Sequence, residues 1–187
     1  MTFLAAGTLA ALLSGCLTST APEVSYWMVE YKGASAAKGG ARHAVARLSS
    51  LQVRAPYDVR DIPVLRADGS MAFDPYNKFP VIPSQLLRGA AIDALAASGS
   101  FGSVVTASSA VSADVSAEVS VLKLALDCRN EGVRKAVASV AVRIVDRGRN
   151  TISVATGAGE ADAASGEYST AFSLAFSSAM AGALGAQ

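Results

Sequence analysis

The segment VSADVSAEVSV, residues 111–121, is the stretch from which the fold of this chain is best predicted. Val and Ala occupy every odd position, while Ser, Asp and Glu occupy every even one. A strict period of two predicts a β-strand with one buried and one exposed face. The alternation changes phase at Leu122, where Leu122, Leu124 and Leu126 become the apolar set, which indicates a β-bulge or a change of covered face.

The residues after this strand predict an antiparallel meander. Residues 135–147 alternate again, with an apolar set expected to face inward: Ala136, Ala138, Val140, Val142 and Ile144. Gly148 is expected to turn the chain into a further strand over residues 151–156. The glycine-containing residues 157–166 are interpreted as a polar loop.

The residues before the central strand predict several shorter strands. These are expected over residues 24–31, 48–54, 59–66, 71–73 and 101–107. Asp68-Gly69-Ser70 is a turn signal that predicts a hairpin. The basic, Gly- and Ala-rich residues 32–47 are interpreted as a loop, and Pro75, Pro80 and Pro83 are expected to interrupt the chain.

Two segments carry the spacing of amphipathic helices. Pro83 opens the first, which runs to Ser98 and ends before Gly99. The second runs from Tyr168 to Leu184, and its apolar stripe consists of Phe172, Phe176, Ala179, Met180 and Ala183. The sequence therefore predicts one α+β domain over residues 24–187, an antiparallel sheet with two helices packed on one face as an α/β sandwich.

The first residues predict an exported, lipid-anchored protein. An apolar run from Phe3 to Leu12 is too short to span about 30 Å of hydrocarbon, which indicates a signal peptide over residues 1–15. Leu13-Ser14-Gly15-Cys16 looks like a bacterial lipobox, in which Cys16 is lipidated and becomes the first residue after cleavage. Residues 16–23 then form a lipidated tether. Because the next residue is Leu17 and not Asp, the pattern favours the periplasmic face of the outer membrane over the inner membrane.

Composition and motifs argue against several classes of function. A net charge of +1 gives no long-range field for nucleic acid. His43 has no further ligand at metal-binding spacing, and Cys128 is interpreted as buried packing. Asp114 and Glu118 stand about 13 Å apart on a strand, beyond the separation of glycosidase carboxylates, and are interpreted as a solvated face. We expect no enzyme activity, no metal and no cofactor.

Four features together resemble a known family: Tyr26-Trp27-Met28-Val29, the segment 53–66 with Val53-Arg54-Ala55-Pro56-Tyr57, the aromatic segment 76–79, and the helix from Pro83 that precedes Phe101-Gly102-Ser103-Val104-Val105. They are similar to the auxiliary lipoproteins of ABC-type transport systems, the family of the paraquat-inducible Pqi lipoprotein. The resemblance implies a periplasmic lipoprotein that works with an MCE (mammalian cell entry) domain protein and an ABC or paralogous permease. Such a protein would dock a conduit for phospholipid at one membrane.

The resemblance suggests a contact surface for the partner or for lipid. Tyr76, Phe79, Val81 and Ile82 form an apolar run between prolines, outside regular structure. The alternative is that these side chains simply cover the edge of the sheet. A homo-oligomer that matches an oligomeric MCE partner is a further hypothesis. The competing functions are an assembly lipoprotein of the outer membrane, similar in layout to the lipopolysaccharide-assembly lipoprotein that plugs a barrel, and a lipid-anchored hydrolase.

Overall fold

The computed structural model describes residues 22–34 and 43–185. The signal peptide, the lipobox with Cys16 and most of the tether lie outside the described residues, as does part of the predicted loop 32–47. The elements are β1 Ser25–Tyr26, β2 His43–Val53, β3 Asp61–Arg66, β4 Met71–Lys78, α1 Pro83–Ala97, β5 Phe101–Val105, β6 Val115–Cys128, β7 Lys135–Asp146, β8 Thr151–Asp162 and α2 Tyr168–Gly185.

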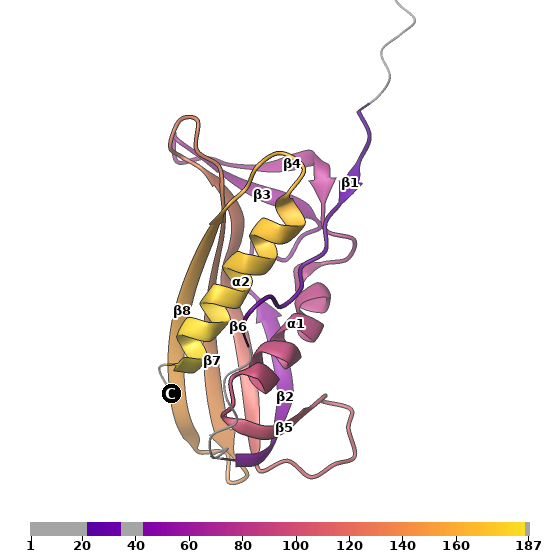
Figure 1. The fold of residues 1–187 in the computed structure, drawn as a ribbon, viewed down its shortest axis with the longest axis vertical. Helices are drawn as coiled ribbons and strands as arrows, with labels where there is room; N and C mark the ends of the chain where they lie inside the picture. The colour runs from indigo at the N-terminus through magenta and orange to yellow at the C-terminus, as the bar shows by residue number, and fades with distance from the viewer. Residues whose placement is uncertain (1–21, 35–42, 186–187) are drawn as a thin grey trace, which may run out of the picture.

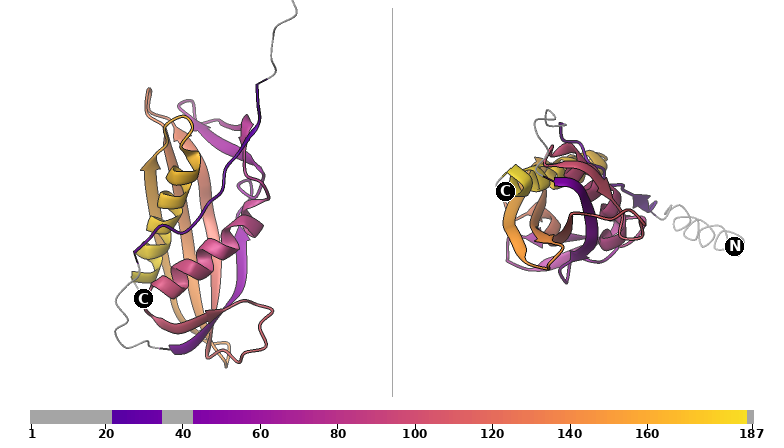
Figure 2. Two further views of the ribbon diagram at one scale, coloured as in Figure 1. Left: turned by 45° about the vertical axis from the view of Figure 1, so that its right-hand side comes forward. Right: turned by 90° about the horizontal axis from the view of Figure 1, so that it is seen from below.

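All eight strands form one curved sheet with β6 at its centre (Figures 1 and 2). On one edge β6 pairs in parallel with β2 and, further along, in parallel with β3. On the other edge it pairs antiparallel with β7, which pairs antiparallel with β8. The predicted meander is therefore confirmed for β6 to β8. The prediction of a purely antiparallel sheet is wrong, because β2, β3 and β5 enter parallel pairs.

Strand β6 has the predicted faces and the predicted bulge. Val115, Ala117, Val119 and Val121 are all buried, and the pairing with β7 shifts register between Val121 and Lys123. The bulge at Leu122 is thus confirmed. The strand begins at Val115 and not at residue 111. The guanidinium of Arg47 holds the preceding loop instead, since it donates to the carbonyl oxygens of Ala107, Ser109 and Val111.

Both helices lie on one side of the sheet, as predicted (Figure 1). Pro83 occupies the first turn of α1, and the carboxylate of Asp58 accepts a hydrogen bond of 2.8 Å from the Ser84 N–H, which satisfies one of the unpaired donors there. Gly99 follows α1 with φ of +71°, the conformation that favours glycine after a helix. The predicted apolar stripe of α2 is fully buried. Within the described part of the chain, neither helix combines the length and hydropathy needed to cross a membrane.

Strand β8 continues through the segment that was predicted to be a loop. A Cβ atom on Gly157 would lie 2.0 Å from the Ala179 carbonyl oxygen, and one on Gly159 would lie 2.2 Å from the Ala175 carbonyl oxygen. Both atoms belong to α2, which crosses β8 directly. The glycines therefore let the backbone of the helix approach the strand, and the prediction that they mark a loop is wrong.

Three other predicted boundaries change. The strand predicted over residues 24–31 is reduced to Ser25–Tyr26, and residues 27–34 form no regular strand. Strand β2 begins at His43, inside the predicted loop. Strand β4 continues past Pro75 to Lys78. Asp61 of β3 pairs with Lys78 and Pro63 pairs with Phe73, so the β4 residues between Phe73 and Lys78 bulge out of the pairing.

Candidate functional site

Tyr76, the first of the predicted contact residues, is exposed on the outward bulge of β4. The carboxylate of Asp74 fixes this bulge by accepting hydrogen bonds from the backbone N–H groups of Tyr76 and Asn77, at 2.9 Å and 3.0 Å. The side-chain amide of Asn77 donates to the same carboxylate at 2.9 Å. Tyr76 is thus held at the surface by a defined turn, and the expectation that it lies outside regular structure is wrong.

Phe79 lies in the core. Its side chain is fully buried and packs edge to face on Phe172 of α2, with ring centroids 5.3 Å apart. A contact between the Phe79 side chain and a partner would require the core to open, so its burial argues against Phe79 as part of a docking surface. Val81 is exposed and Ile82 is half-buried, in the turn that leads into α1. The structure therefore leaves Tyr76, Val81 and Ile82 at or near the surface.

The first described segment is built into the domain next to β4. The Trp27 N–H donates to the Lys78 carbonyl at 2.8 Å, and the indole N–H donates to the Asn77 side chain at 2.9 Å. The indole also packs edge to face on Tyr168 of α2, with ring centroids 5.5 Å apart. The described N-terminal residues are therefore joined both to the sheet and to α2.

This segment then runs between α1 and α2, as Figure 2 shows. Ser173 and Ser177, one helical turn apart on α2, accept hydrogen bonds from the backbone N–H groups of Glu30 (3.0 Å) and Lys32 (2.7 Å). Val29, which lies between Trp27 and Glu30, is buried. Two serines on the apolar face of α2 are the signal for such a contact, although the sequence does not show which chain segment they bind.

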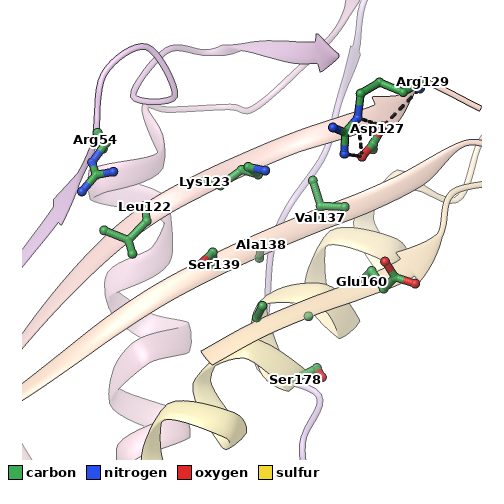
Figure 3. Close-up of a pocket in the computed structure, with 12 residues that line it drawn as sticks. Arg54, Leu122, Lys123, Asp127, Arg129, Val137, Ala138, Ser139, Glu160 and Ser178 are labelled. Atoms are coloured by element: carbon green, nitrogen blue, oxygen red, sulfur yellow. Dashed lines mark hydrogen bonds and ion pairs between the residues drawn. The ribbon is translucent and has the colours of Figure 1, made fainter. Parts of the chain in front are cut away.

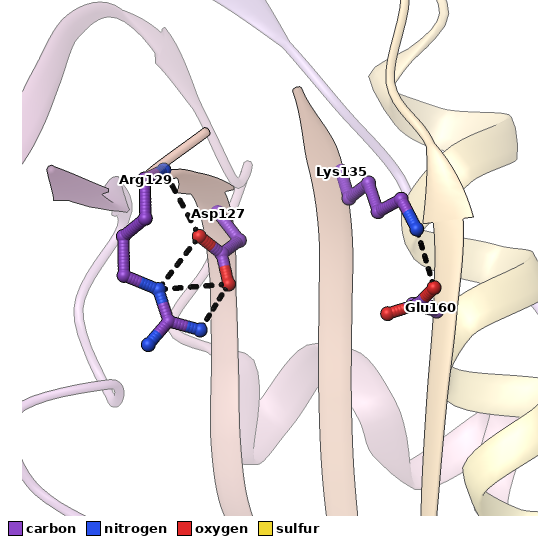
Figure 4. A network of polar contacts seen from close by, with 4 residues as sticks. All are labelled: Asp127, Arg129, Lys135 and Glu160. Carbon is purple, nitrogen blue, oxygen red and sulfur yellow. Dashed lines mark hydrogen bonds and ion pairs between the residues drawn. The ribbon is translucent and has the colours of Figure 1, made fainter. Parts of the chain in front are cut away.

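A shallow depression of about 640 Å³ lies on the sheet near the bulge of β6 (Figure 3). Asp127 on its border accepts hydrogen bonds from the Arg129 Nε, at 2.9 Å to Oδ1 and 3.1 Å to Oδ2, and these bonds hold the pKa of the Asp127 carboxyl below its usual value. Lys135 donates to Glu160, which raises the pKa of the lysine (Figure 4). Arg54 and Lys123 also line the depression, so its basic side chains outnumber its acidic ones.

The remaining candidate polar residues have structural partners. His43 stacks on Phe101, with ring centroids 6.2 Å apart. Asp114 accepts hydrogen bonds from the Val45 N–H at 2.9 Å and from Arg147 at 2.8 Å, so it ties two segments together. Cys128 is half-buried at the end of β6. No group of three or more His, Cys, Asp or Glu side chains is placed to hold a metal ion in residues 22–34 and 43–185.

Comparison with known proteins gives matches at the level of structure. A Xanthomonas campestris protein described as belonging to family DUF330 is similar with a TM-score of 0.58, 14% identity and coverage of 87% of this chain and 88% of its own. A second crystal structure, of a protein described as uncharacterized, is similar with a TM-score of 0.55 and 16% identity, over 75% of this chain and 80% of its own.

A PelC dodecamer from Paraburkholderia phytofirmans is less similar, with a TM-score of 0.47, 20% identity and coverage of 82% of this chain and 92% of its own. No family model and no curated protein matches the sequence. At identities of 14% and 16% the first two matches show a common architecture alone. The chain therefore shares its fold with the DUF330 protein of Xanthomonas campestris.

Proposed function

We propose that this chain is a lipid-anchored protein of the outer membrane that docks an MCE-domain lipid-transport assembly at the periplasmic face. The observation that carries the proposal is the lipobox-like sequence Leu13–Cys16, followed closely by a segment that is bound to α2 of the domain. The family resemblance of the sequence supports the choice of an MCE-domain protein with an ABC or paralogous permease as the partner.

The firm attachment of the first segment suits a docking protein. A protein that positions one end of a conduit must present its contact surface at a fixed height and angle above the membrane. Residues 27–32 are bound at Lys78 of β4 and at Ser173 and Ser177 of α2, and Val29 is buried between these points. Residues 27–32 and the sheet would therefore move as one body.

The turn between β4 and α1 is the proposed contact with the protein partner. Val81 is exposed and Ile82 is half-buried, and an aliphatic pair of this kind contributes to a protein interface when a partner covers it. The turn is positioned from both sides, because Phe79 is packed in the core and the Ser84 N–H is bound to Asp58. A partner would thus meet a surface that is already ordered.

The test is crosslinking in intact cells, followed by affinity purification of the tagged protein from solubilised membranes and mass spectrometry. Recovery of an MCE-domain protein together with its permease is the expected result. Recovery of an outer-membrane barrel protein would favour the assembly lipoprotein instead. Recovery of nothing above background would refute the docking function.

Substitutions locate the contact. The double variant Val81→Asp and Ile82→Asp is expected to lose the crosslinked partner while the circular dichroism spectrum stays unchanged. The control is Val111→Asp, which places one such carboxylate on an exposed valine in the loop before β6. If the double variant and the control recover the partner equally, the turn is not the docking surface.

A further inference from the structure

One end of the molecule carries a group of exposed apolar side chains. The β3–β4 hairpin, the turn between β6 and β7 and the described start of the chain all lie at the end drawn uppermost in Figure 1. Exposed side chains on these segments are Val24, Tyr26, Phe73, Tyr76 and Val133, which we name the end patch. Tyr26 is 55% exposed and Tyr76 is 46% exposed, although both are large apolar groups.

Strand pairing directs part of the end patch outward. Ser25 and Tyr26 of β1 pair in parallel with Asn77 and Lys78 of β4, and extending this register places Val24 beside Tyr76. Trp27 and Asn77 hydrogen-bond to each other on the opposite, core-facing side. Since side chains alternate along a strand, Val24, Tyr26 and Tyr76 share the outward face.

The two tyrosines are held in place before any contact is made. The Asp74 carboxylate fixes the backbone on which Tyr76 stands. The guanidinium of Arg60 lies over the ring of Tyr26, 5.5 Å from its centroid. The backbone at Tyr76 and the ring of Tyr26 are thus ordered before this face meets another surface, which favours binding.

The length of chain between Cys16 and the domain indicates which surface the end patch meets. Six residue steps separate Cys16 from Pro22, so that even a fully extended chain spans only about 20 to 22 Å. Once Cys16 carries a lipid, the end patch must therefore remain close to the bilayer. We propose that the end patch sits in the headgroup region of the membrane that holds the lipid anchor. This inference rests on the lipid anchor of the proposed function.

The chemistry of the end patch fits a lipid surface. Tyrosine is a side chain typical of membrane interfaces, where the ring sits at headgroup depth and the hydroxyl reaches water. Residues 60–78 contain three basic and three acidic side chains, and residues 127–134 contain two of each. Attraction to anionic lipid is thus weak, and the contact depends on the apolar side chains, which would enter about 5 to 10 Å into the interface.

The test measures the depth of single positions in the full lipidated protein. In a Cys128→Ser background, an environment-sensitive probe is attached to Tyr76→Cys or to Phe73→Cys, and the protein is reconstituted in phosphatidylethanolamine–phosphatidylglycerol vesicles that contain spin-labelled lipid. The control is the same probe on Val111→Cys, in an exposed loop before β6. We expect several-fold stronger quenching at the end patch than at the control, with little change when the vesicles are made only of neutral lipid.

A variant tests the tyrosines themselves. Adding Tyr26→Asp and Tyr76→Asp to the protein labelled at Phe73→Cys should reduce its quenching to the level of the Val111→Cys control. If the protein fails to float with the vesicles, the lipid anchor and this inference are both refuted. Protein that floats while the end-patch probes remain as unquenched as the control would overturn this inference alone and leave the docking function standing.

Discussion

Substitution of Gly157 by alanine tests whether β8 and α2 touch backbone to backbone. The added Cβ would lie 2.0 Å from the Ala179 carbonyl oxygen and 2.5 Å from the Ala183 N–H nitrogen, whereas ordinary contacts begin at 3.4 Å. The helix would have to retreat by about 1.4 Å at this point, since both atoms are backbone. Such overpacking costs about 1 to 3 kcal/mol in free energy of unfolding. For a domain of this size the melting temperature should fall by roughly 2 to 12 °C.

The assay is urea denaturation followed by circular dichroism, with two glycine controls. Gly182 lies on α2 facing Gly157, but its Cβ would be at 3.5 Å from the Gly157 Cα, an ordinary contact. Gly89 of α1 has open space around it. Alanine at either helical position should stabilise the protein by up to about 1 kcal/mol. If Gly157→Ala unfolds within about 0.5 kcal/mol of the unchanged protein, the close approach of β8 and α2 is wrong.

Three further perturbations test other contacts. Phe79→Ala should lower the free energy of unfolding by about 3 to 5 kcal/mol in the same assay, because the ring is fully buried. Ser177→Ala should speed hydrogen exchange at the Lys32 amide, which loses its acceptor, at a cost of about 1 to 3 kcal/mol. The pKa of Asp127 is lowered in the folded protein, so the stability that this carboxylate contributes is present above the carboxyl pKa of the unfolded chain and is lost as pH falls. Arg129→Ala should therefore reduce the loss of stability that urea titrations show below about pH 4.

Matched variants separate these effects from general damage. Val81→Ala removes an exposed side chain and should change stability by less than about 0.5 kcal/mol, so an equal loss in Phe79→Ala and Val81→Ala would contradict the buried position of the ring. Ser178→Ala removes an exposed hydroxyl next to Ser177. Unchanged exchange at Lys32 in Ser177→Ala would rule out the bond to the helix. If stability falls with pH in the same way in Arg129→Ala as in the unchanged protein, the pairing of Arg129 with Asp127 is ruled out.

Sequence periodicity predicts the elements that bury one face. The alternation in residues 115–121 and the stripe that contains Phe172 and Phe176 both appear in the structure as buried faces. The phase change at Leu122 likewise predicts the observed bulge. These features could be predicted because burial on one side of a strand or helix repeats with the local geometry of that element.

The remaining features depend on residues far away in the sequence. A strand alternates in the same way whether its neighbour is parallel or antiparallel, so the parallel pairing of β2 with β6 leaves no local signal. In the sequence Gly157 is typical of a loop, because the close approach of the Ala179 backbone is visible only in the structure. Phe79 between two prolines suits a surface as well as a core, and Phe172 decides the outcome. The sequence therefore did not show which of the candidate residues would be buried and which exposed.

The attachment of residues 27–32 has a mechanical consequence. A protein held between a membrane and a partner experiences tension along the chain that leads to its anchor. The bonds from Trp27, Glu30 and Lys32 to Lys78, Ser173 and Ser177 follow one another along this segment, which runs inward from the end where the chain leaves the domain (Figure 2). Force applied through the proposed anchor would therefore shear these bonds together instead of breaking them one at a time, and the domain would resist unfolding from this end.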